Sequence, residues 1–534
     1  MKKFSLLCLG ALAGGCTVGP NYQAPKPALG ASFGAAPGTA AGATVAPPSA
    51  VVPGIEAVAR WWQVFDDPEL NALVERAVRD NRDLKLAVSR LRQARAQRLM
   101  VSAGLWPEVD ASGGFYRGRG SQNVVIPLGA FGGSGAGAPA GGGAAGGSSS
   151  ASTRRVADVS SGGSGDSSGA GGGAPPGGPN NPLGEGGLPG VVTNLYQAGF
   201  DASYEFDVFG GTRRAIEAAE ANVAGAEEAR RATLVSLLAE VASTYVGLRA
   251  QQLRLEIARQ NLAAQNGTLT IVHQKAEAGF GTDLDVALQS AQVAATAATL
   301  PAMESAERDS IHRLAVLLGE NEPEALGAEL AAPAKLPPVP PQVPIGVPSD
   351  LLRRRPDIRG AERQLAAANA QVGVATAALF PSFSLTGTLG LDSSTVKTLP
   401  NWGSRYYSIS PGLSWPILDW GRLRANIRLE DELKEQAWLN YQKTVTQALQ
   451  EVADALVHYR SEQFRRLALH QAVAASQQSL TLARQKADQG LADMLTVLEA
   501  QRSLLSAQDA LAQCDGTIRS DLIALYKALG GGWE

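Results

Sequence analysis

Three residues near the C-terminal end of the chain place an apolar, an acidic and a basic side chain on one helical face. Leu495, Glu499 and Arg502 are spaced four and three residues apart, which brings them to the same side of an α-helix. If three copies of this helix met around an axis, the glutamates would form a ring of negative charge beside three arginines. The alternative is a solvated Glu–Arg pair that stabilises a single helix by about 0.2–0.5 kcal/mol.

A second copy of this segment lies earlier in the chain and lacks the charges. GTDLDVALQSAQ at 281–292 aligns with ADMLTVLEAQRS at 492–503. The positions that match the charged face are Leu284, Leu288 and Ala291. Helix packing alone therefore does not demand an acid and a base here, which favours a functional constriction over an incidental ion pair.

The whole chain is an internal duplication. Asp83 and Pro107 have the same spacing as Asp357 and Pro381, and the segment beginning EVA at Glu240 matches the one beginning EVA at Glu451. We assign the first repeat to 61–331 and the second to 349–534, with a Pro-rich linker over 332–348. The first repeat is longer because it contains a Gly-rich segment, predicted to be a flexible loop over 120–194.

The N-terminus is typical of an exported lipoprotein. Lys2 and Lys3 precede a short apolar run and small residues, as in a signal peptide over 1–15. Cys16 follows directly and is the predicted lipidation site, although Ala13 departs from the usual lipobox leucine. An ordinary signal peptide with an incidental cysteine is the alternative. Residues 16–60 are then a lipid anchor and an Ala/Pro/Gly-rich spacer.

Long amphipathic helices dominate each repeat. Residues 82–104 form one helical run, and 211–278 form an uninterrupted helix of roughly 100 Å. Apolar residues step by four and three along 234–248 and again along 445–459, which is coiled-coil spacing. Gly279 and Gly490 mark turns into return helices near 282–318 and 492–529. Asp283, Asp285 and Asp493 flank these turns as candidate partner or ion contacts, or simply as helix N-terminal acids.

Four segments alternate apolar and polar residues as strands do, at 108–117, 196–207, 382–391 and 406–417. Segments of about ten alternating residues suit a membrane β-barrel, although a sandwich edge would also alternate. Since four strands are too few for either a barrel or an independent sandwich, we expect three chains to form one barrel of twelve strands. The predicted fold class is α+β: this membrane barrel continues into a long α-helical coiled-coil tunnel outside the bilayer.

Composition argues against several other classes. The net charge is −3, which gives no reason to expect nucleic acid as a partner. The four histidines, His273, His312, His458 and His470, lack metal-ligand spacing, and GDSSG at 165–169 lies in low-complexity sequence. We therefore expect no enzyme, no catalytic residues, no metal and no cofactor. A hydrolase on the outer membrane and a coiled-coil surface protein are the rival classes.

Several motifs together resemble one family. They are CTVGPNY at 16–22, WWQVFDDPEL at 61–70, LAVLLGE at 314–320, VPSDLLRRRPDIR at 347–359, LTVLEAQRS at 495–503 and LYKALGGGW at 525–533. The chain resembles a TolC-like outer-membrane factor of the NodT-type lipoproteins that serve RND-type efflux pumps. The resemblance covers nearly all of the mature chain, and the Gly-rich insertion is its main departure.

The resemblance carries specific expectations. It implies a homotrimer that is lipid-anchored in the bacterial outer membrane, with a helical tunnel in the periplasm. It implies docking to a periplasmic adaptor (membrane fusion) protein and through it to an inner-membrane RND pump, for export of small molecules such as drugs. By motif, the closed periplasmic gate maps onto Leu495, Glu499 and Arg502, and Gly279 and Gly490 onto the turns that meet the adaptor. A type I secretion channel is the alternative within the same class.

Overall fold

The computed structural model describes residues 17–25, 27, 50–53, 59–119, 192–332, 335–345 and 348–533. The predicted signal peptide and Cys16 lie outside these residues. So does the predicted Gly-rich loop, except for its last three residues, which already belong to a strand. The chain divides into two compact units. One contains the helices (Met1–Leu105, Asp207–Ser382 and Ser414–Glu534), and the other contains the four-stranded sheet (Trp106–Phe206 and Phe383–Leu413).

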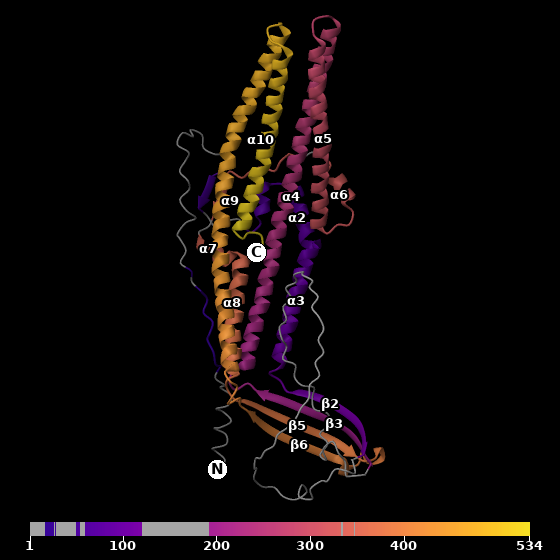
Figure 1. Cartoon of the computed structure of the whole chain (residues 1–534), viewed down its shortest axis with the longest axis vertical. Coiled ribbons are helices and arrows are strands. Elements are labelled where there is room, and N and C mark those ends of the chain that lie inside the picture. The colour runs from indigo at the N-terminus through magenta and orange to yellow at the C-terminus, as the bar shows by residue number, and fades with distance from the viewer. Residues whose placement is uncertain are drawn as a thin grey trace, which may run out of the picture. The chain divides into compact units, whose positions relative to one another are not determined.

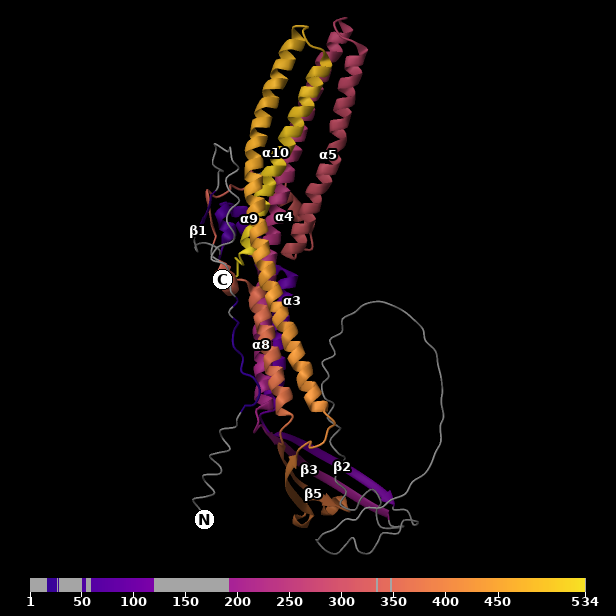
Figure 2. The ribbon, with the colours of Figure 1, turned by 60° about the vertical axis from the view of Figure 1, so that its left-hand side comes forward.

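Two long helical hairpins form most of the helical unit (Figures 1 and 2). The first pairs α4 (Gly211–Glu277) with α5 (Asp283–Leu318), and the second pairs α9 (Arg422–Asp488) with α10 (Met494–Ala528). The shorter helices α3 (Arg82–Ala103) and α8 (Pro356–Ala377) pack lengthwise on these hairpins, in the order α3, α4, α8, α9. The uninterrupted helix predicted over 211–278 is confirmed, as are both return helices.

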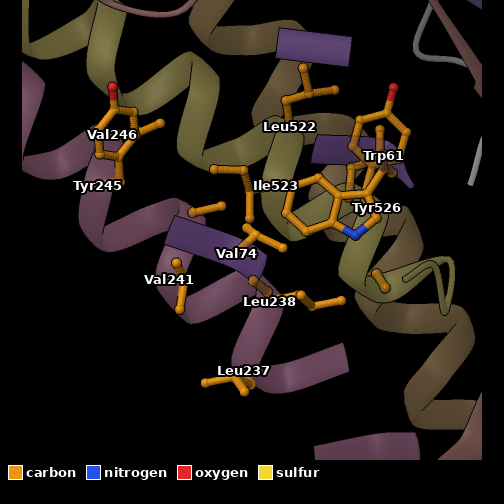
Figure 3. Packing of buried hydrophobic residues seen from close by; sticks show 14 of the residues in the cluster. Trp61, Val74, Leu237, Leu238, Val241, Tyr245, Val246, Leu522, Ile523 and Tyr526 are labelled. Carbon is orange, nitrogen blue, oxygen red and sulfur yellow. The ribbon is translucent and has the colours of Figure 1, made fainter. Parts of the chain in front are cut away.

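The core of the helical unit lies where short N-terminal elements meet both hairpins (Figure 3). The 3₁₀ helix η1 (Trp61–Phe65) and α2 (Pro68–Asp80) bury their apolar side chains against α4 and α10. Trp61 stacks on Tyr526 with 5.7 Å between ring centroids. Asp67 accepts hydrogen bonds from the backbone N–H groups of Glu69 and Leu70, so it caps α2.

The duplication is visible in the hydrogen bonds as well as in the sequence. The Asn81 side chain donates to the Leu317 carbonyl oxygen at 2.8 Å, at the end of α5. The corresponding residue of the second repeat, Arg355, donates to the Ala528 carbonyl oxygen at 2.9 Å, at the end of α10. Two different side chains therefore satisfy the same helix terminus in the two repeats.

The segments predicted as a spacer and a Pro-rich linker contain a small sheet. β1 (Ala50–Pro53) pairs in parallel with β4 (Gln342–Ile345). Helices α6 (Pro323–Leu330) and α7 (Pro348–Arg354) flank the second of these strands in the chain. The spacer over 16–60 and the Pro-rich linker over 332–348 are thus partly structured, through a contact that neither sequence signals on its own.

The second unit is a four-stranded sheet in the order β2, β3, β5, β6. Its strands are β2 (Glu108–Arg119), β3 (Val192–Phe206), β5 (Ser382–Ser393) and β6 (Arg405–Ser414), and the short 3₁₀ helices η3 (Val396–Thr398) and η4 (Trp402–Ser404) join the last two. Phe200 lies opposite Ala111 on one neighbour and Leu389 on the other, whereas Asp201 lies opposite Asp110 and Thr388. One face is therefore apolar and the other polar, as the alternation predicted.

Large apolar side chains on the sheet are exposed in the single chain. They include Val109, Phe115, Phe200, Leu389, Tyr407, Ile409 and Leu413. Strands β2 and β6 are the outer strands of this sheet, and each has one side that pairs with no other described strand. Among the helices whose residues the structure describes, none is both long enough and apolar enough to cross a membrane.

Candidate functional site

The candidate site lies at the turns of the two hairpins, which have the same backbone geometry. Gly279 and Gly490 adopt φ values of +80° and +73°, a left-handed conformation that glycine takes without strain. The next N–H, of Phe280 or Leu491, donates at 2.8 Å to the carbonyl oxygen of Lys275 or Lys486 respectively. Both long helices therefore end in a glycine-terminated motif of the kind predicted.

The acidic residues beside these turns cap the return helices. Thr282 and Asp285 form a reciprocal capping box at the start of α5. In α10 the roles are exchanged: Asp493 accepts hydrogen bonds from the Thr496 backbone N–H (3.1 Å) and hydroxyl (2.7 Å). These bonds, chiefly the one from the hydroxyl, lower the pKa of Asp493. Asp283 is the exposed first residue of α5.

Leu495, Glu499 and Arg502 lie on the exposed side of α10. All three are exposed, whereas Val497, Ala500 and Leu504 on the other side are buried. Within the described part of the chain, Glu499 takes part in no ion pair. The local Glu–Arg pair considered as the alternative is therefore not formed in the single chain, and Glu499 is free to interact beyond it.

Arg502 instead connects the two hairpins. Its Nε donates to the Gln292 side-chain oxygen of α5 at 2.5 Å. One residue earlier, the Gln501 amide donates to the Thr268 hydroxyl of α4 at 3.2 Å. Closer to the turns, the Lys275 ammonium lies 3.1 Å from the Asp488 carboxylate, which joins α4 to α9. Sequence reasoning missed Gln292, Thr268 and Lys275, because no local pattern indicates a partner more than two hundred residues away.

A groove of about 580 Å³ separates the ends of the two hairpins. Its walls come from the end of α4, the start of α5, the end of α9 and the start of α10, with Asp285 and Asp493 at the rim. Phe280 and Leu491, which follow the turn glycines at corresponding positions, are 84% and 73% exposed. The ends of the hairpins thus combine an open groove with two protruding apolar side chains.

The described carboxylates of this region are not grouped as metal ligands would be. Across the described parts of the chain, no group of three or more His, Cys, Asp or Glu side chains is close enough to bind a metal ion. The geometry offers instead a contact between helices, from Arg502 of α10 to Gln292 of α5, beside the exposed Glu499 carboxylate, which forms no ion pair with a described residue.

The sequence of the chain matches a known family in both repeats. The family described as "Outer membrane efflux protein" matches residues 73–320 and 347–531. The antibiotic efflux pump outer membrane protein ArpC of Pseudomonas putida is 31% identical, with 99% of this chain and 96% of ArpC covered. The outer membrane protein OprJ of Pseudomonas aeruginosa is 30% identical, with 99% and 96% covered.

The solved structures that resemble this chain are also outer-membrane channels. The outer-membrane channel OprN has a TM-score of 0.78 and 34% identity, covering 97% of this chain and 100% of OprN. The open state of the Neisseria gonorrhoeae MtrE outer membrane channel has a TM-score of 0.71 and 25% identity, covering 97% and 99%. The α+β fold expected from the sequence is that of these channels. The chain belongs to the outer membrane efflux protein family.

Proposed function

We propose that three copies of the chain form the outer-membrane channel of a tripartite RND-type efflux system, closed at its periplasmic end by α10. The family supports the channel, and the name of ArpC supports small molecules such as antibiotics as cargo. The two unpaired edges of the sheet, β2 and β6, support a homotrimer, because sheets of neighbouring copies would satisfy those strands. We place the protein in the outer membrane with its helices in the periplasm.

The exposed face of α10 carries the gate in this proposal. Leu495 and Glu499 are exposed and available to line a lumen, and the exposed Arg502 lies beside them in contact with Gln292 of α5. Glu499 has no cationic partner among the residues that the structure describes, so three copies would give a carboxylate ring that attracts cations and narrows the pore. The hydrogen bond from Arg502 to Gln292 would hold α10 against α5 in the closed arrangement, and opening would break it.

The groove between the hairpin ends is the proposed adaptor contact. It lies beside Gly279 and Gly490, and its open wall includes Phe280 together with the capping residues Asp285 and Asp493. A helical adaptor tip that entered the groove would compete with the Lys275–Asp488 ion pair, which spans it at 3.1 Å. Docking would thereby loosen the contact between α4 and α9 and link adaptor binding to gate opening. The inner-membrane pump would act through this adaptor.

Conductance of the trimer in planar lipid bilayers tests the gate. We expect Glu499→Ala combined with Arg502→Ala to raise single-channel conductance several-fold and to reduce preference for cations over anions. The first effect follows from losing the Gln292 contact, and the second from losing the carboxylate ring. An unchanged conductance and an unchanged ion preference would remove the gate assignment.

A matched variant controls for loss of charge alone. Arg259 and Glu304 form an exposed ion pair of 2.7 Å between α4 and α5, away from the turns. Arg259→Ala with Glu304→Ala removes the same two charges, so it should leave conductance unchanged if the effect belongs to α10. An equal rise in both double variants would assign the effect to general loosening of the helices.

A further inference from the structure

The six residues that follow the predicted lipidation site are held in a defined place on the helical unit. We call Thr17–Tyr22 the strap. The Val18 N–H donates to the Phe209 carbonyl oxygen at 3.1 Å, just before α4 begins. The Tyr22 hydroxyl donates to the Glu362 carboxylate of α8 at 3.2 Å. Both ends of the strap are thus bonded to the body of the protein.

A buried arginine and a buried asparagine donate hydrogen bonds to the strap between these ends. Arg214 is 4% exposed, and its guanidinium donates to the carbonyl oxygens of Val18 (3.1 Å) and Gly19 (3.3 Å) and to the Asn21 side chain (2.7 Å). Asn369, also 4% exposed, donates to the Pro20 carbonyl oxygen at 3.0 Å. Arg214 also pairs with the Glu217 carboxylate at 2.7 Å, one turn along α4, so the strap supplies three of its four acceptors. Because a buried guanidinium that loses acceptors is disfavoured, these side chains form a socket that is fully satisfied when the strap fills it.

Glycines allow the strap backbone to touch the helix behind it. Gly19 has φ of +90°, and a Cβ atom there would lie 2.5 Å from the Cα of Gly373 in α8. A Cβ on Gly373 would in turn lie 2.9 Å from the Arg214 side chain. Neither position tolerates a larger residue without moving backbone or the guanidinium, so the fit depends on both glycines.

We propose that this socket is a mount for the acylated N-terminus, with Arg214 and Asn369 as its positioning residues. The inference rests on the outer-membrane location of the proposed channel and on the sequence-based prediction that Cys16 carries the lipid. Cys16 is joined directly to Thr17, and Thr17 is held beside Gly210 at the start of α4. The acyl chains therefore leave the protein at one fixed point beside α4 and enter the bilayer there.

The mount changes the role of the Ala/Pro/Gly-rich spacer. That segment follows the strap in the chain, so it does not lie between the lipid and the socket. Its length therefore has no influence on how far the helical unit sits from the membrane. Instead the spacer joins the strap to β1 and η1 in the chain. The docked strap alone determines where the lipid is attached relative to the helical unit.

Proteolysis of the purified full-length protein in detergent tests the mount. Chymotrypsin cuts after tyrosine, so cleavage after Tyr22 releases the acylated peptide 16–22, which mass spectrometry identifies with its lipid. Gly19→Ala places a Cβ against the Gly373 backbone, and it changes no residue within a helix. We expect it to accelerate release about tenfold or more, because cleavage at a docked segment follows how often that segment opens. Arg214→Gln should have the same effect through loss of the guanidinium contacts.

Three further measurements separate loss of strap docking from global unfolding and from loss of channel function. Gln23→Ala alters an exposed residue just beyond the strap and should leave the release rate at the wild-type value. The helical circular dichroism of Gly19→Ala should match the wild type, which excludes global unfolding. Equal release from the wild type and Gly19→Ala would overturn the socket, and release of an unacylated peptide would overturn its role as a lipid mount. Conductance measurements decide the channel proposal independently of either result.

Discussion

The two long hairpins share a backbone but bury different side chains near their turns. Helices α4 and α9 have 67 residues each and end in the same glycine motif. Beneath the exposed face of α10, the second hairpin has an apolar cluster of Leu480, Ala483, Val497, Ala500 and Leu504. The first hairpin instead buries Gln265, Gln289, Gln292 and Thr296. Duplication preserved the scaffold, while the interior near the turns diverged.

This difference indicates which hairpin is the firmer support for a gate. An apolar cluster directly behind Leu495, Glu499 and Arg502 fixes the orientation of that face. In the first hairpin, the side-chain oxygens of Gln265 and Gln289 are buried and make no hydrogen bond to any described residue, whereas near the turn of the second hairpin the described residues include one such oxygen, on Gln501. Each such group costs about 1–3 kcal/mol, so the first hairpin is the less tightly held of the two near its turn.

The largest expected effect comes from opening a cavity in the apolar cluster. Leu504→Ala removes a buried side chain from between α9 and α10, which typically destabilises by about 2–5 kcal/mol. Hydrogen–deuterium exchange of peptides covering 480–504 should accelerate accordingly. Val293→Ala, at the corresponding and only half-buried position of α5, is the matched control and should have a smaller effect on 269–293. Equal acceleration in both hairpins would contradict the difference between their interiors.

A reciprocal exchange of side chains should have an intermediate effect. Gln289 and Ala500 occupy corresponding positions, one polar and one apolar, and both are buried. Gln289→Leu loses one hydrogen bond of 2.9 Å to the Gln265 carbonyl oxygen but also removes an unpaired oxygen, so we expect a change within about 1 kcal/mol.

The opposite change should be clearly destabilising. Ala500→Gln forces an amide into the apolar cluster, where none of the cluster side chains can hydrogen-bond to it, at a cost of about 1–3 kcal/mol. Exchange rates of the peptides around each site measure both variants. A larger loss from Gln289→Leu than from Ala500→Gln would show that the polar interior of the first hairpin is the essential one.

Sequence patterns predicted the elements of this fold well but not their distant contacts. Helices, glycine turns and alternating strands each have a period that a short window contains, so their positions followed from residue types. The β1–β4 pairing joins two four-residue segments that each contain a proline, one in the N-terminal spacer and the other in the linker between the repeats. The binding of Arg502 to Gln292 and of Arg214 to the strap likewise joins positions about two hundred residues apart. Such contacts depend on how whole helices pack, which no local period encodes.

The candidate site was likewise predictable only in part. The comparison of the two copies singled out Glu499 and Arg502, because an acid and a base replaced Leu288 and Ala291. The same comparison did not separate capping from partner binding at Asp285 and Asp493. Those carboxylates make hydrogen bonds within their own helix ends, and only atomic positions distinguish this from an outward-facing acid.

The smallest expected effect is a pH dependence confined to the start of α10. Hydrogen bonds from Thr496 lower the pKa of Asp493 below its ordinary value of 3.8. A lowered folded-state pKa means that the ionised cap stabilises the helix above the unfolded pKa, and that this contribution is lost as pH falls through the folded pKa. Exchange of the 493–498 amides, corrected for intrinsic rates, should therefore become faster relative to the rest of α10 on acidification below 3.8. The control is a variant that cannot titrate at this position. Asp493→Asn keeps a capping side chain without a titrating group, so it should abolish that pH dependence while the first turn remains folded. If the amides of Asp493→Asn and of the wild type respond to acid equally, the titrating group lies elsewhere. The exchange of capping roles between the two hairpins would then have no consequence for stability.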